Sequence, residues 1–187
     1  GLNELGIDAA VVMGDLIDSA ADLEGEIKHL QTIEAEVAKL DAPRHYILGN
    51  HCVHLLTKDE FIQHTAMRTP HSAFDLAGVR FIILDSCFTA DGEPYQRGNF
   101  TWTDANLPDD QLGWLEAQLE EAPGPAIVLT HQRIDGLDEP HNVNNAEAAR
   151  GILQQAGNVP LVLSGHSHQN LHEQVNGIDY AVIRAMV

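Results

Sequence analysis

Four short apolar runs in this 187-residue chain each stop at a residue of a type that binds metal ions. These residues are Asp15, Asn50, His131 and His166, and His168 follows two positions after the last of them. A carboxylate oxygen, an amide oxygen and neutral imidazole nitrogens form a mixed donor set that suits divalent Mn, Fe or Zn. The pattern therefore predicts a metal centre.

The segment Gly165-His166-Ser167-His168 carries the sharpest local signal. Residues two apart on an extended chain point the same way, so the two imidazoles can face two neighbouring ions. Gly165 lets the backbone approach the site closely. The alternative is a histidine-rich surface segment, because His172 lies nearby and the chain holds 11 histidines.

Each proposed ligand, taken singly, also has an ordinary structural explanation. Asp15 could cap the helix that follows it, Asn50 could form a turn, and His131 could be a hydrogen-bonded histidine at a strand terminus. Their joint position at strand ends favours a shared site, because ligands of open α/β sheets bind outside the carboxyl ends of the strands.

The elements that would position these residues alternate between extended and helical periodicity, which is typical of α/β proteins. Five apolar runs are predicted strands: 7–13, 44–48, 79–84, 126–130 and 161–164. Apolar residues three and four apart predict three helices, over 20–40, 109–121 and 145–156. An Asn-Gly pair between the runs 171–175 and 178–183 predicts a hairpin, so the sheet is expected to be mixed.

The net charge of the chain limits the kinds of molecule that it can bind. The chain has 10 Lys and Arg and 28 Asp and Glu, which give a formal net charge of −18. It has no basic stripe, so nucleic-acid binding is disfavoured. A small phosphate-containing substrate remains compatible, because bound cations reverse the local charge. No run approaches the roughly 18 apolar residues of a membrane span, so no membrane partner is expected. The cellular location stays open, with the cytoplasm favoured. Cys52 and Cys87 are interpreted as free thiols.

Four motifs follow one another along the chain: Gly14-Asp15, Gly49-Asn50-His51, Thr130-His131 and Gly165-His166-Ser167-His168. The ordered set resembles the calcineurin-like metallophosphoesterase superfamily. The resemblance implies a mixed-sheet, four-layer α/β sandwich that binds two divalent ions. It implies that Asp15 bridges both ions, that Asn50, His131 and His166 complete one site and that His168 serves the other. His51 is implied to be the catalytic acid.

Two departures from the family pattern stand out. The Asp-x-His motif of the family's first strand does not occur before Asp15. Leu2 and Leu5 are typical of the last turn of a helix, so the missing strand is expected upstream of Gly1. The expected organisation is a single metallophosphoesterase domain over residues 1–187, truncated at both ends and lacking its first strand. The second departure is Cys52, where the family usually has a carboxylate that would orient His51.

The resemblance implies metal-dependent hydrolysis of a phosphate ester by a metal-activated water. The layout around Asp85-Ser86 and residues 111–115 is most similar to members that cleave small phosphodiesters or nucleoside-diphosphate compounds. Two loops, 88–108 and 133–145, carry groups that could bind substrate or only pack the loops: Tyr95, Arg97, Phe100, Trp102, Arg133, His141 and Asn142.

Two other classes of function are compatible with the sequence. A catalytically weak or inactive scaffold of the same fold is the main alternative, and metal storage by an acidic, histidine-rich protein is a third. The chain has neither a Gly-x-Ser-x-Gly segment nor a P-loop, which disfavours a serine hydrolase or a P-loop nucleotide hydrolase.

Overall fold

The computed structural model describes residues 1–137 and 139–184, in which strands and helices alternate. The strands are β1 (Ala10–Val12), β2 (Arg44–Tyr46), β3 (Ser72–Leu76), β4 (Val79–Ile83), β5 (Ala126–Leu129), β6 (Leu161–Ser164), β7 (Leu171–Val175) and β8 (Ile178–Val182). The α-helices are α1 (Leu23–Val37), α2 (Lys58–Gln63), α3 (Asp109–Glu120) and α4 (Ala146–Ala156). Short 3₁₀ helices are η1 (Leu2–Leu5), η2 (His51–Val53) and η3 (Glu139–His141).

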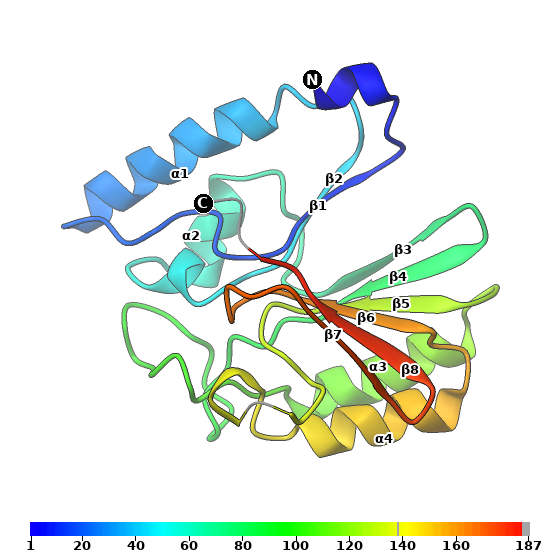
Figure 1. Ribbon diagram of the computed structural model, residues 1–187. Coiled ribbons are helices and arrows are strands. Elements are labelled where there is room, and N and C mark those ends of the chain that lie inside the picture. Colours follow the sequence, from blue (N-terminus) through cyan, green and yellow to red (C-terminus); the bar gives the residue numbers. More distant parts are fainter. Residues whose placement is uncertain (138, 185–187) are drawn as a thin grey trace.

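Two sheets form the centre of the molecule, and helices cover their outer faces (Figure 1). One core cluster lies between the sheets and contains Ile47 from beyond β2 together with Ile83 and Leu129 from the larger sheet. A second cluster joins α1 and α2 to the smaller sheet, and a third joins α3 and α4 to the larger one. This order of layers confirms the predicted four-layer α/β sandwich.

The smaller sheet pairs β1 and β2 in parallel, with α1 as the connection between them. Helix α1 begins after Asp22, whose side chain accepts a hydrogen bond from the Gly25 amide. Its inner face carries Glu26, which is fully buried. The two carboxylate oxygens of Glu26 accept the amide protons of Ala20 and Leu55, at 3.1 and 3.0 Å. Glu26 therefore connects α1 to the two loops that follow β1 and β2.

The larger sheet has the order β3-β4-β5-β6-β8-β7. Its four inner strands are parallel, whereas β3 and β7 pair antiparallel with their neighbours in the chain. The turn at Asn176-Gly177 joins β7 to β8 with positive φ angles of 52° and 84°, as a tight hairpin turn requires. The predicted mixed sheet and its terminal hairpin are thus confirmed.

The structure also departs from the predicted elements. Strand β3 and helix α2 were not predicted. The turn that joins β3 to β4 is Ala77-Gly78, which lacks the Asn-Gly signal of a hairpin. Helix α2 spans less than two turns, too short for a helical period to show in the sequence. The helix predicted over 20–40 is shorter, since its cap at Asp22 fixes the start. Both cysteines are free, as predicted, and both are buried. Within the described ranges, no helix has the length and apolarity needed to cross a membrane.

Replacing Glu26 with Gln should destabilise the fold. The amide nitrogen of Gln cannot accept a backbone proton, so one buried N–H loses its partner, at a cost of about 1–3 kcal/mol. Urea unfolding would measure this loss, and Glu24→Gln, an exposed change in the same helical turn, should change stability by less than about 0.5 kcal/mol. Equal stability of the two variants would contradict the role of Glu26.

Candidate metal centre

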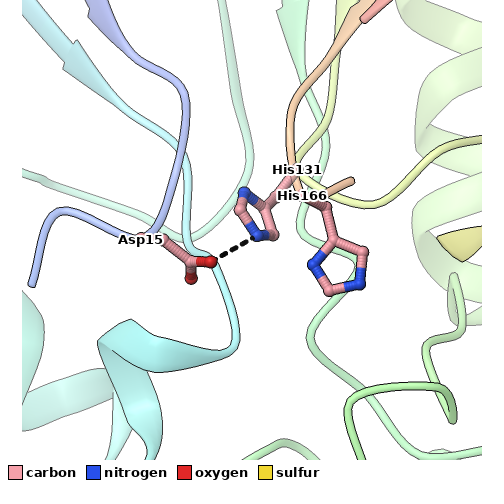
Figure 2. Close-up of side chains that lie close together, drawn as sticks. All are labelled: Asp15, His131 and His166. Carbon is pink, nitrogen blue, oxygen red and sulfur yellow. Dashed lines mark ion pairs between the residues drawn. The ribbon is translucent and has the colours of Figure 1, made fainter. Parts of the chain in front are cut away.

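Three of the predicted ligands converge where the two sheets meet. One ligand atom each of Asp15, His131 and His166 lies within 4.8 Å of the others. Figure 2 shows Asp15 reaching from the loop after β1 toward the two histidines, which follow β5 and β6. All three loops leave the carboxyl ends of parallel strands, as the sequence predicted.

His131 is held with one nitrogen directed at Asp15. Its Nδ1 lies 2.9 Å from the carbonyl oxygen of Met13; because a carbonyl can only accept, Nδ1 donates the proton and Nε2 bears the lone pair of the neutral ring. Nε2 lies 3.0 Å from Oδ2 of Asp15. Two ligands that bind one ion at about 2.1 Å and at right angles are separated by about 3 Å. The spacing therefore suits a shared cation.

The electrostatics of the cluster support the same assignment. Burial raises the pKa of Asp15, but the neighbouring His131 and His51 outweigh burial and lower it to about 2. Burial lowers the pKa of His131, but Asp15 outweighs burial and raises it above the ordinary value. Burial, assisted by His131, lowers the pKa of His166 to about 3. At neutral pH the carboxylate is therefore ionised and His166 is a neutral ring, the form that ligates metals.

Several buried side-chain atoms have no hydrogen-bond partner among the described residues, and two of them are possible donor atoms of the proposed ligands Asn50 and His166. These two are Oδ1 of Asn50, whose residue is 6% exposed, and Nε2 of His166. A buried polar atom without a partner costs about 1–3 kcal/mol. Both atoms can donate a lone pair to a cation, so the donor set fits the predicted metal ion. His168 is exposed and lies outside the group of three converging residues.

The backbone at the proposed ligands is constrained. Asp15, His166 and His168 have positive φ angles of 48°, 65° and 56°, a left-handed conformation that is uncommon outside glycine and tends to gather at functional sites. A Cβ atom at Gly14 would collide with the ring of His131, and one at Gly49 would collide with Asp15. The glycines of the first two motifs therefore permit the close approach of the ligand loops.

His51 is anchored to the same carboxylate and to a second one. Its backbone N–H donates to Oδ1 of Asp15 at 2.9 Å, and its side-chain Nδ1 lies 2.9 Å from Oδ1 of Asp18. Asp18 thus supplies the carboxylate that the sequence pattern leads one to expect at Cys52. The Asp15-x-x-Asp18 spacing within one loop was the sequence signal for this pair, and it was missed. Burial raises the pKa of Cys52 to about 12, so this thiol is an inert core residue.

The end of β4 is held by polar contacts that sequence reasoning did not identify. Asp85 and Lys58 form an ion pair at 2.5 Å with little exposure, and the Lys58 ammonium lies 3.4 Å from the centre of the Phe88 ring. The side-chain amide of Gln111 pairs with both backbone groups of Asp85. These contacts fix the start of the 88–108 loop.

A two-sheet sandwich with acidic and histidine side chains gathered at its strand ends is typical of metallophosphoesterases. The family model described as calcineurin-like phosphoesterase matches residues 1–170, and the chain belongs to this family. The enzyme class predicted from the motifs, a metal-dependent phosphoesterase, is the class of this family.

Relatives and solved structures agree with this assignment. A probable cyclic nucleotide phosphodiesterase of Synechococcus is 27% identical over 181 residues, covering 86% of this chain and 63% of the relative. A manganese-dependent ADP-ribose/CDP-alcohol diphosphatase of Oryza sativa is 21% identical, covering 96% of this chain and 68% of the relative. The crystal structure of a dimetal phosphatase from Danio rerio has the same fold, with a TM-score of 0.81 at 16% identity, covering 97% of this chain and 74% of that one. The chain thus spans about two thirds of the length of these curated relatives.

Mn²⁺ titration calorimetry should show binding that depends on this cluster. Asp15→Asn removes the negative charge of one converging donor and His131→Ala removes a donor nitrogen, so each should weaken the affinity at least about tenfold. His172→Ala, which removes an exposed histidine paired with Asp179, should leave the affinity unchanged. If His172→Ala weakened binding as much as His131→Ala, the ion would be held by a histidine-rich surface instead.

The affinity for Mn²⁺ should also rise with pH. The Asp15 carboxylate raises the pKa of His131, so below that pKa the ring carries a proton that the cation must displace. The affinity should therefore increase by roughly tenfold per pH unit below the pKa of His131 and level off above it. Titrations at pH 5.5 and 7.5, in buffers of different ionisation enthalpy, would report the released proton. An affinity independent of pH would show that His131 is not a ligand.

Proposed function

We propose that the protein catalyses metal-dependent hydrolysis of a phosphate ester. The observation that carries this proposal is the convergence of Asp15, His131 and His166 at the ends of β1, β5 and β6, with His51 bonded to the same carboxylate. A purely structural scaffold has no physical need for a buried Asn50 acceptor without a partner or for two left-handed histidines. We therefore favour the enzyme over an inactive scaffold.

Two divalent cations fit the proposal, with Mn, Fe or Zn as candidates. Asp15, Asn50, His131 and His166 would hold one ion, and Asp15 and His168 would contribute to the other. The name of the rice relative, a manganese-dependent diphosphatase, supports Mn. When bound, such ions polarise phosphate oxygens and activate water as a nucleophile.

His51 would serve as the proton donor to the leaving oxygen. Its Nδ1 is engaged by Asp18, and its backbone N–H is engaged by Asp15. The Asp15 contact holds the backbone of His51, and the Asp18 contact orients the ring and leaves Nε2 for the substrate. The side chain is 41% exposed, so a substrate can reach it without movement of the core.

The proposed substrate is a small phosphodiester or a nucleoside-diphosphate-type compound. The curated relatives are named for cyclic nucleotides and for ADP-ribose or CDP-alcohols, which are compounds of this kind. A long polyanion would be repelled by the net charge of −18. We also propose that residues 1–187 belong to one domain, because the described elements pack as a single set of four layers.

Hydrolysis of bis(p-nitrophenyl) phosphate by the full-length protein should require added Mn²⁺ or a similar cation. Treatment with EDTA should abolish turnover, and excess Mn²⁺ should restore it, because bound ions would supply the activated water. Release of p-nitrophenol is the measurement. Turnover that persists after complete metal removal would refute the mechanism.

His51→Ala should lower kcat by roughly 10²–10⁴-fold, since a positioned proton donor contributes about that much. Metal content, measured by plasma emission spectrometry, should stay near that of the unmodified protein because His51 is not a ligand. His54→Ala, an exposed change at the end of η2, is the matched control and should retain kcat. Loss of metal from His51→Ala would reassign His51 as a ligand.

A further inference from the structure

One large aromatic ring is left half-exposed beside the metal centre. Trp102 is 45% exposed, and its ring centre lies 5.6 Å from that of the proposed ligand His166. The ring of His141 lies 5.3 Å from Trp102 and 5.6 Å from His166. The three rings therefore form a triangle, with one corner at the metal centre.

The other candidate groups of the 88–108 loop are used for packing. Tyr95 is fully buried and stacks on Phe100, with ring centres 3.8 Å apart and an interplanar angle of 5°. Arg97 pairs with Glu60 at 2.5 Å and donates to the carbonyl oxygen of Leu55. These contacts hold the loop in place.

The same loop is tied to the segment that carries His141. The carboxylate of Asp104 accepts hydrogen bonds from the amide of Ala90 at 3.2 Å and from the side chain of Asn144 at 2.9 Å. The backbone N–H of Asn144 also donates to the carbonyl oxygen of Ala105 at 2.7 Å. Trp102 is thus presented on a braced loop, which limits the entropy lost when a ligand stacks on it.

We propose that Trp102, with His141 beside it, forms a shelf that stacks on a planar group of the substrate, a nucleobase in the first instance. The proposal rests on the proposed function, which places the phosphate at the metal centre. From there, a base joined to that phosphate through a sugar lies within reach of a ring that adjoins His166. Stacking recognises the flat face of the base and needs no cation from the protein, which suits so acidic a chain.

A binding measurement tests the shelf independently of turnover. The chain has two tryptophans, and Trp114→Phe leaves Trp102 as the only indole. AMP should quench its fluorescence, whereas ribose 5-phosphate, which has the same phosphate without the base, should not. This arm keeps the native Trp102, so it does not depend on the folding of any variant there. Equal effects of the two ligands, or the absence of any AMP effect, would overturn the shelf.

Variants at Trp102 provide the second arm. Trp102→Ala should weaken AMP binding, measured by calorimetry, by roughly 5- to 150-fold, the range found when an aromatic partner of a base is removed. Trp102→Phe should recover most of this loss, and the affinity for ribose 5-phosphate should be the same in all three proteins. Unchanged AMP affinity in Trp102→Ala would overturn the proposal.

The two proposals fail in different ways. Mn²⁺-dependent hydrolysis without any preference for AMP over ribose 5-phosphate would refute the shelf and leave the activity standing. Quenching of Trp102 by AMP without hydrolysis of any diester would refute the activity and leave the shelf as a nucleotide-binding surface.

Discussion

The close approach of Asp15 and His131 is the constraint on which the rest of the structure depends. Their oxygen and nitrogen lie 3.0 Å apart although they follow strands of different sheets. The hydrogen bond between His131 and the Met13 carbonyl connects the same two strand ends. The amide of Gly165 donates to the His131 carbonyl oxygen at 3.0 Å. The residues of the site therefore also hold the two sheets together at the carboxyl ends of their strands.

Much of this arrangement was predictable because the residues that end apolar strands can be recognised in the sequence. A buried strand is apolar, so the first polar residue after it is conspicuous, and parallel strands bring such residues to one edge. That reasoning identified Asp15, His131 and His166 before their geometry was known. It could not identify Glu26 or the Lys58–Asp85 pair, because a buried polar contact between distant segments leaves no periodic trace in the sequence.

The loops show a second limit of sequence reasoning. Tyr95, Phe100 and Trp102 have similar chemistry and lie close together in the chain, and nothing in their spacing separates a packing role from a binding role. The fold separates them, because Tyr95 and Phe100 stack on each other whereas Trp102 does not pair with them. Asp18 is a similar case, since its role as a partner of His51 depends on where the fold places the His51 ring.

The Asn50 acceptor, which has no partner among the described residues, and the left-handed backbone at the proposed ligands are features that a bound cation would stabilise. A cation that binds only the folded chain shifts the folding equilibrium by mass action, by about 2.7 kcal/mol at a free concentration one hundred times its Kd. Resistance to heat would then track the supply of divalent ions around the protein. Metal scarcity would then reduce the amount of folded protein.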